Sequence, residues 1–289
     1  VLSASSDDNS IRIYKNSNGR ADSFSAADVV VVYAYAYGAS SVFAADMDGD
    51  GHLDVLSASS GDNSIRIYKN SNGQADSFTA ADVDGNALGA RSVFAADMDG
   101  DGHLDVLSAS SGDNSIRIYK NSNGLANSMT AVDVDGGALD ASSVFAADMD
   151  GDGHLDVLSA SNGDGSIRIY KNSNGQADNF TAADIVLVDG LGAWSVFAAD
   201  MDGDGHLDVL SASLTLTSIM IYHSLIDSCP LHASKVNRGN TSFCEACHPG
   251  TYAPPESTGE CYLHRCAPGQ TDNDSDPSTP CTPCGVGHA

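Results

Sequence analysis

One nine-residue segment, Asp-Met-Asp-Gly-Asp-Gly-His-Leu-Asp, occurs four times without a change, at 46–54, 97–105, 148–156 and 200–208. Its positions 1, 3, 5 and 9 are aspartates, and glycines stand at positions 4 and 6. Alternate side chains of a tight loop converge on one point, and glycine permits the positive φ that a sharp turn needs. Carboxylates held this close repel one another unless a cation lies between them. The segment therefore predicts a cation-binding loop.

Calcium is the predicted cation, because Ca²⁺ takes about six to eight hard oxygen ligands in proteins. Each copy would supply its four carboxylates and the backbone carbonyl of the histidine at position 7, with water completing the shell. The predicted ligands are Asp46, Asp48, Asp50, His52, Asp54, Asp97, Asp99, Asp101, His103, Asp105, Asp148, Asp150, Asp152, His154, Asp156, Asp200, Asp202, Asp204, His206 and Asp208. The alternative, a plain Asp/Gly-rich turn, requires neither acids at fixed offsets nor identical copies. We expect about four ions, one per loop.

The loop begins like an EF-hand loop and ends differently. An EF-hand has a bidentate Glu at position 12 and a helix on each side, whereas here position 12 is always serine and the flanks are typical of strands. These serines are Ser57, Ser108, Ser159 and Ser211. A calcium-bearing β-hairpin of this kind resembles the FG-GAP/VCBS repeats of integrin-α-like β-propellers, in which a D-x-D-x-D-G-x-x-D loop joins the first two strands of a blade. The resemblance covers roughly residues 1–225.

The loops begin at residues 46, 97, 148 and 200, a spacing that is typical of propeller blades or solenoid units. We predict an all-β fold of blades with four antiparallel strands, because the apolar residues alternate and Asn-Gly and Asp-Gly pairs interrupt every run. In one unit the strands are expected near 42–46, 55–59, 64–69 and 78–82. Val55 and Ala58 would share one face, and Ile65 and Ile67 would point to the core.

The number of blades is predicted from the strands present. Residues 1–225 would form four blades and most of another, truncated at the N-terminal side of a larger ring of about seven blades if the chain follows the family. A closed ring of about five blades is the alternative. The run Val-Val-Val-Val-Tyr-Ala-Tyr-Ala-Tyr at 29–37 departs from the repeat and is predicted to be a longer fourth strand.

A second, cysteine-rich domain is predicted at 226–289, because the first 228 residues contain no cysteine. The seven cysteines follow a C-x14-C-x2-C-x13-C module and a second copy of it that ends before its last cysteine. They are Cys229, Cys244, Cys247, Cys261, Cys266, Cys281 and Cys284. Such a cluster indicates disulfides and an oxidising compartment, although a zinc site is the alternative. The modules resemble ephrin-receptor-like and TNF-receptor-like cysteine-rich modules, and spacing alone leaves the pairing open.

The charge of the chain argues against two classes of partner. Its formal net charge is −26, whereas binding to nucleic acids or to anionic membranes requires positive patches, so we expect neither as a partner. One Arg and one Lys recur in every unit on the third predicted strand: Arg12, Lys15, Arg66, Lys69, Arg117, Lys120, Arg168 and Lys171. Salt bridges to nearby acids are the favoured interpretation, and a basic ring that holds an anionic ligand is the alternative. Trp194 stands where other units have Ser40, Arg91 and Ser142. It is interpreted as a packing residue, with a sugar-stacking platform as the alternative.

No enzyme constellation is present: the chain has no nucleophile elbow, zinc-hydrolase motif or phosphate loop. The paired carboxylates are assigned to calcium, and the loop histidines are expected to face solvent. We therefore predict a non-enzymatic, extracellular or cell-surface adhesion or recognition module that binds a protein or glycan ligand. The fragment has no apolar run long enough to span a membrane. A carbohydrate-binding lectin, or the accessory propeller of a secreted polysaccharide-degrading enzyme, is the alternative.

Overall fold

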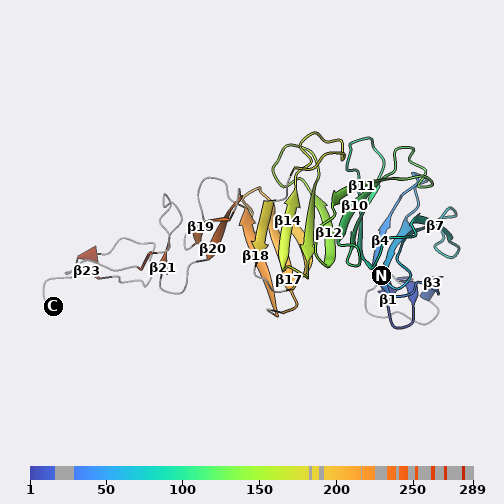
Figure 1. Ribbon diagram of the computed structural model, residues 1–289, viewed down its shortest axis with the longest axis horizontal. Helices are drawn as coiled ribbons and strands as arrows, with labels where there is room; N and C mark the ends of the chain where they lie inside the picture. The colour runs from blue at the N-terminus through green and yellow to red at the C-terminus, as the bar shows by residue number, and fades with distance from the viewer. Residues whose placement is uncertain are drawn as a thin grey trace. The chain divides into compact units, whose positions relative to one another are not determined.

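The computed structural model describes residues 1–16, 29–181, 184–188, 192–215 and 217–224, and six further short segments. In 184–188 and beyond residue 222, the backbone alone is described. All the regular secondary structure in these residues is β-strand, which confirms the all-β prediction (Figure 1). No helix in the described part of the chain is long and apolar enough to cross a membrane.

The repeats form successive antiparallel sheets. The first sheet has three strands, β1 (Leu2–Ser5), β2 (Ser10–Tyr14) and β3 (Val29–Tyr33). The second is β4 (Ala39–Ala45), β5 (Asp54–Ser59), β6 (Ser64–Lys69) and β7 (Thr79–Asp84). The third is β8 (Ala90–Ala96), β9 (Asp105–Ser110), β10 (Ser115–Lys120) and β11 (Thr130–Asp135). The fourth is β12 (Ala141–Ala147), β13 (Asp156–Ser161), β14 (Ser166–Tyr170) and β15 (Asp184–Val188).

The fifth repeat contributes β16 (Ala193–Ala199), β17 (Asp208–Ser213) and β18 (Ser218–Ser224). The tail adds β19 (Ala233–Arg238), β20 (Thr241–Ala246), β21 (Thr251–Tyr252), β22 (Tyr262–Leu263), β23 (Gln270–Thr271) and β24 (Thr282–Pro283). In the tail β19 pairs with β20, β21 with β22 and β23 with β24, all antiparallel.

Strand positions agree with the sequence pattern in most of each repeat. The third strand at 64–69 is confirmed, the first is longer than predicted, and the fourth begins one residue later, at Thr79. In the 29–37 run the strand β3 ends at Tyr33, so the predicted longer fourth strand is wrong. Each four-stranded sheet joins its strands in chain order, with a register shift where the third strand meets the fourth.

The hydrophobic core lies between sheets. Leu56, Ile65 and Ile67 of the second sheet pack with Val93 and Tyr119 of the third. The third and fourth sheets form an equivalent cluster. Each buried face belongs to two repeats, so no sheet of this kind buries its apolar residues alone. In chain order the inner strands are in contact, β1 with β4, β4 with β8 and β8 with β12.

One predicted face is wrong. Val55 lies in the cluster with the first sheet, whereas Ala58 lies in the cluster with the third, because residues three apart on a strand point to opposite faces. The predicted inward direction of Ile65 and Ile67 is confirmed. On the opposite face of β6, Tyr68 is buried against the preceding sheet rather than exposed.

The chain divides into two compact units. One comprises Val1–Ala198 with Ser211–Met220, and the other comprises Ala199–Leu210 with Ile221–Ala289. The predicted domains 1–225 and 226–289 stay a prediction, as does the number of blades in a ring. Of the seven cysteines, the described backbone includes only Cys244, in β20, and the other six lie outside the described residues.

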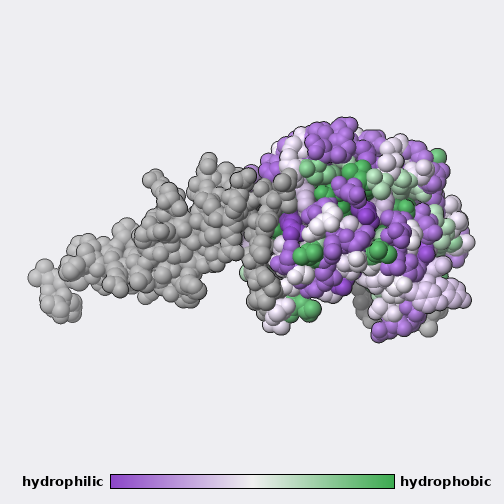
Figure 2. Space-filling view, in the orientation of Figure 1, coloured by the Kyte–Doolittle hydropathy of each residue, from purple (hydrophilic) through white to green (hydrophobic). Residues whose placement is uncertain are grey.

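Seven of the eight recurring basic residues form ion pairs, which confirms the favoured interpretation for them, whereas Lys15 donates to the Gln74 carbonyl. Arg66 contacts Asp62 and Asp82, and Arg117 contacts Asp113 and Asp133, both at 2.8 Å. Each arginine thereby joins the turn before its strand to the fourth strand. In the face drawn in Figure 2, hydrophilic residues predominate among the coloured atoms, with hydrophobic patches between them.

Candidate calcium loops

Each repeated segment is the turn of a hairpin. In the second sheet it connects β4 to β5, whose pairing ends with Ala45 opposite Asp54. Gly49 and Gly51 adopt φ of 72° and 88°, and a Cβ at either position would meet no atom within 4 Å. Glycine is therefore required for the backbone conformation rather than for space. The turn brings side chains at positions 1, 3 and 5 to one side of the loop.

The carboxylates of each loop converge as predicted. Ligand-capable oxygens lie within 4.8 Å of one another in four groups, so each loop could hold a metal ion. The groups are Asp46, Asp48 and Asp50; Asp97, Asp99 and Asp101; Asp148, Asp150 and Asp156; and Asp200, Asp202 and Asp208. The first two loops gather positions 1, 3 and 5, whereas the last two gather positions 1, 3 and 9. The predicted ligand at position 9 is thus outside the group in the first two loops, and the one at position 5 is outside it in the last two.

Three carboxylate oxygens in these loops test whether a cation fits. Oδ1 of Asp46, Asp48 and Asp99 is buried and accepts no hydrogen bond in the described structure. Their other oxygens are engaged: Oδ2 of Asp46, for example, accepts from the Gly51 N–H at 2.9 Å. A buried carboxylate oxygen without a donor is unfavourable unless a cation neutralises it. The donor set is all oxygen, as Ca²⁺ requires.

The aspartate at position 9 has a structural role of its own. Asp105 is fully buried, and its two oxygens accept from the backbone N–H groups of Met98 at 3.0 Å and Asn121 at 2.8 Å. Burial is the main cause that raises the pKa of Asp105 to about 6; the two N–H groups oppose the rise, and the nearby Asp99 and Asp101 add to it. The pKa of Asp156 is likewise raised to about 6, chiefly by burial. Position 9 thus fastens the loop to the end of the third strand.

The loop histidines face a neighbouring turn. A Cβ built on Gly124 would lie 2.5 Å from the His103 ring, and one on Gly175 would lie 2.4 Å from the His154 ring. Each imidazole therefore covers the turn after the third strand of its own sheet. His103 and His154 are exposed residues, in agreement with the expectation that they face solvent, although their rings also cover this turn. The metal-binding role of their carbonyls stays a prediction.

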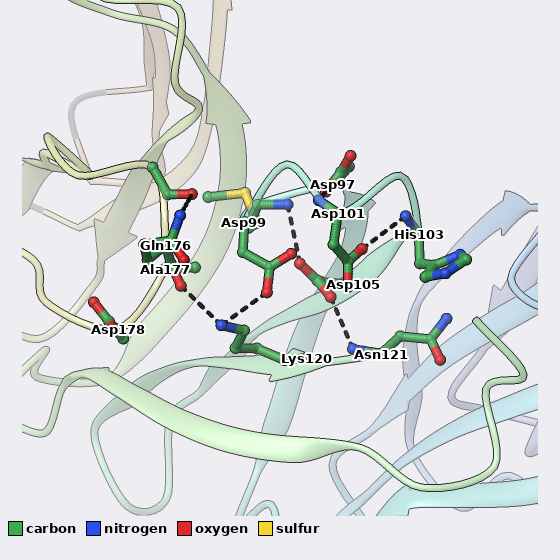
Figure 3. Close-up of polar contacts among 12 residues, drawn as sticks. Asp97, Asp99, Asp101, His103, Asp105, Lys120, Asn121, Gln176, Ala177 and Asp178 are labelled. Carbon is green, nitrogen blue, oxygen red and sulfur yellow. Dashed lines mark hydrogen bonds and ion pairs between the residues drawn. The ribbon is translucent and has the colours of Figure 1, made fainter. Parts of the chain in front are cut away.

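A lysine contacts the position 3 carboxylate in three loops. Nζ lies 3.3 Å from Asp48 in the Lys69 pair, 2.7 Å from Asp99 in the Lys120 pair and 3.2 Å from Asp150 in the Lys171 pair. Figure 3 shows the contact between Lys120 and Asp99. The hydrogen bond to Asp99 holds the pKa of Lys120 above its usual value. Lys120 also donates to the carbonyl of Gln176 in the next sheet at 2.8 Å.

A buried asparagine reaches the loop from the other direction. Asn121 Nδ2 donates to the carbonyl of Met47, in the loop of the preceding repeat, at 2.9 Å. Asn172 Nδ2 donates in the same way to the carbonyl of Met98 at 2.8 Å. Each side-chain oxygen accepts a backbone N–H from its own turn, so these asparagines are fully engaged.

A family model described as FG-GAP-like repeat matches residues 1–57, 46–108, 97–159 and 148–211. The chain belongs to the FG-GAP-like repeat family. Each matched FG-GAP-like segment except the first begins at position 1 of one loop, and the four copies overlap by one loop and part of the following strand. The loops are thus part of what defines the family match.

The FG-GAP-like chain also resembles a solved structure, the biofilm matrix protein Bap1 of V. cholerae. The two share 22% sequence identity with a TM-score of 0.41, over 74% of this chain and 31% of the Bap1 chain. The FG-GAP-like chain thus corresponds to less than a third of the length of Bap1. No curated protein matches the chain.

Sequence reasoning identified the carboxylates of these FG-GAP-like repeats and missed their partners. The recurring lysines were assigned to salt bridges, but their contact with the calcium loop was not foreseen. Their constant distance of 15 residues after position 9 was the available signal. The asparagines that follow the lysines recur in the same way, and their contact with the preceding loop spans 74 residues.

Proposed function

We propose that this FG-GAP-like repeat chain is a calcium-binding extracellular adhesion or recognition module. Calcium would stiffen the hairpins that connect the first two strands of each blade, and the blades would present a face to a protein or glycan ligand. The proposal assigns no catalytic role to any residue. The observation that carries it is the set of buried carboxylate oxygens without hydrogen-bond donors, at Asp46, Asp48 and Asp99.

The physical argument is one of charge. Three carboxylates within 4.8 Å of one another repel, and the loop contains glycines that allow this conformation. The lysine beside each of three loops contributes one positive charge and contacts Oδ2 of position 3 rather than Oδ1. A divalent cation bound by the remaining oxygens would offset the repulsion in every loop.

Metal analysis tests the calcium part. Wild-type protein dialysed against calcium should contain about four ions per chain, one for each loop. Asp99→Asn should lose about one ion, since it removes the charge of one position 3 ligand. Asp133→Asn is a matched control, because Asp133 pairs with Arg117 outside the loops. Equal calcium content in the two variants would contradict the assignment of the loop.

The adhesion part requires a ligand assay. The intact chain should bind immobilised extracellular-matrix protein or glycan in calcium, and EDTA should abolish that binding. Binding that is unaffected by EDTA would separate ligand recognition from the loops and contradict the proposed role of calcium.

The lectin alternative is favoured by Trp194. This residue is 45% exposed, and the Arg91 guanidinium carbon lies 5.2 Å from its ring centroid, so Trp194 is packed in part and its interpretation as a packing residue stays a prediction. An exposed aromatic ring beside polar groups offers a surface for sugar stacking. On a glycan array, Trp194→Ala should lose binding if this candidate holds. Leu53→Ala is the control, since Leu53 is also exposed but belongs to a calcium loop.

For the tail we propose a separate disulfide-bonded domain at 226–289. Its seven cysteines in a short segment rich in proline and glycine support disulfides over zinc. Non-reducing mass spectrometry of secreted protein should find at most about one free thiol, as an odd number of cysteines requires. Zinc together with six or seven free thiols would contradict this proposal.

A further inference from the structure

Lys120 makes two contacts that join different repeats. Its Nζ lies 2.7 Å from Oδ2 of Asp99, at position 3 of the calcium loop in its own sheet. The same Nζ donates at 2.8 Å to the carbonyl of Gln176, in the turn after β14 of the next sheet. Figure 3 shows the ammonium between these two acceptors. Lys69 repeats the arrangement, with Asp48 on one side and the carbonyl of Leu125 on the other.

The same loop and turn are joined at an adjacent residue. Met98, directly before Asp99, accepts a hydrogen bond from Asn172 Nδ2 at 2.8 Å. Asn172 begins the turn that contains Gln176, and its side-chain oxygen accepts from the Ala177 N–H at 3.0 Å. Two consecutive loop residues, Met98 and Asp99, are therefore linked to one turn of the following sheet, Met98 directly and Asp99 through Lys120.

Two other lysines have one contact each and make natural controls. Lys15 donates to the carbonyl of Gln74 in the next sheet at 2.8 Å, and no loop carboxylate contacts it among the described residues. Lys171 lies 3.2 Å from Asp150, and among the described residues no carbonyl of a following turn accepts from it. Within the described part of the chain, Lys69 and Lys120 are therefore the two lysines that contact both a loop carboxylate and the next turn.

We propose that Lys69 and Lys120 are positioning residues that transmit calcium binding from one repeat to the turn of the next. This inference rests on the proposed calcium function. An ion at the unpaired Oδ1 of Asp99 would fix the carboxylate, and the carboxylate would fix Lys120 through Oδ2. Ordering one partner lowers the entropy cost of the second hydrogen bond, to Gln176.

Repulsion between the ion and the ammonium opposes this coupling. The charge of the Asp99 carboxylate would attract both cations, and the Gln176 carbonyl gives the ammonium a second acceptor. Removing the ammonium should therefore leave calcium binding in place while it uncouples the turn. That combination distinguishes a positioning residue from a ligand.

Hydrogen exchange on the intact chain, with and without calcium, tests the proposal. In wild type, calcium should slow exchange in the 172–177 turn, where the Gly175 and Ala177 N–H groups are hydrogen-bonded. In Lys120→Met the calcium-dependent slowing should fall about tenfold, which is the order expected from loss of one charge-assisted hydrogen bond. Lys120→Arg should retain part of it, because the guanidinium can still contact both oxygens. Calcium content should be the same in all three proteins.

Lys15→Met is the matched control. It should speed exchange in the 70–75 turn by the same factor with and without calcium, because Lys15 contacts no calcium loop. If Lys120→Met binds calcium normally and keeps the full calcium-dependent slowing at 172–177, the inference is overturned and the proposed function stands. If the wild-type protein binds no calcium, the proposed function fails, and the inference fails with it.

Discussion

The first junction between sheets differs from the second and third. In the first junction, between the sheets β1–β3 and β4–β7, Tyr68 packs against Tyr33, with ring centroids 5.3 Å apart. In the second junction, between β4–β7 and β8–β11, the equivalent Tyr119 donates its hydroxyl to Asp84 at 2.8 Å. In the third, between β8–β11 and β12–β15, Tyr170 donates to Asp135 at 2.7 Å.

A change in the preceding repeat causes this difference. In the first sheet Tyr33 pairs with Ile11, and at the equivalent position of the second sheet Asp84 pairs with Ile65. The first sheet therefore has an aromatic residue in place of the acceptor carboxylate. Arg66 also lies over the Tyr33 ring, with its guanidinium carbon 5.7 Å from the centroid. In the second and third junctions the preceding sheet contains a candidate calcium loop, at 46–54 and 97–105. One repeat sequence therefore forms an aromatic junction or a polar, loop-linked junction according to its neighbour.

Calcium removal should produce the largest difference between these junctions. With free calcium roughly twentyfold above a typical Kd of ~10⁻⁴ to 10⁻³ M, each site contributes about 1.8 kcal/mol, so four contribute about 7 kcal/mol. We expect EDTA to lower the melting temperature steeply in calorimetry, and hydrogen exchange to rise most in the second and third junctions. An unchanged melting curve would contradict structural calcium, and equal loss at all three junctions would contradict the comparison.

Replacing a core leucine with alanine should cost more stability in the third junction than in the first. Leu107 is fully buried between the third and fourth sheets, whereas the equivalent Leu2 is only partly buried. Leu107→Ala should lower the free energy of unfolding by about 2–5 kcal/mol because it leaves a cavity. Leu2→Ala should cost less, and urea denaturation of both variants measures the difference. Equal costs would mean that the two cores are equally well packed.

Lowering the pH should stabilise the calcium-free loops of the second and third junctions. The folded pKa of Asp105 and Asp156 is raised to about 6, above the unfolded value near 4, so these groups destabilise the fold when ionised. Their penalty is absent below the unfolded pKa, grows as pH rises from about 4 to about 6, and is complete above about 6. In EDTA, the free energy of unfolding should therefore increase by about 2–3 kcal/mol from pH 7 to pH 5.

In saturating calcium the same pH change should have the opposite sign, because protons and calcium compete for the carboxylates. Chemical denaturation at both pH values, with and without EDTA, measures this. A rise in stability from pH 7 to pH 5 in calcium would contradict carboxylate ligation.

Removing a tyrosine hydroxyl should have the smallest effect on stability, and the effect should differ between the second junction and the first. Tyr119→Phe deletes a hydrogen bond to a carboxylate, and we expect a loss of about 1.5 kcal/mol, limited because Asp84 is partly exposed and can be rehydrated. Tyr68→Phe should cost less, since its hydroxyl has a long contact of 3.5 Å with Ser57 and its ring keeps the Tyr33 contact. Thermal denaturation of the two variants compares them directly. A larger cost for Tyr68→Phe would reverse the proposed distinction.

The sequence by itself determined the features that depend on residues close together in the chain, namely the strands and the loop turns. Side-chain alternation in 64–69 predicted a strand with Ile65 and Ile67 inward, and the Asp/Gly spacing of 46–54 predicted a hairpin turn with converging carboxylates. These predictions succeed because strand alternation and turn conformation are set within a few residues of the chain. Where the pattern was misjudged, as for Val55 and Ala58, the error was also local.

Only the tertiary structure decided which groups from different repeats meet. Lys120 reaches Gln176 across 56 residues, Asn172 reaches Met98 across 74, and Arg91 covers Trp194 from two repeats away. No spacing rule specifies these pairs, because they depend on how one sheet stacks on the next. The same stacking leaves Oδ1 of Asp99 without a donor while Lys120 takes Oδ2, and leaves Trp194 half exposed. The loop carboxylates are thus a property of the sequence, and their free oxygens are a property of the packed sheets.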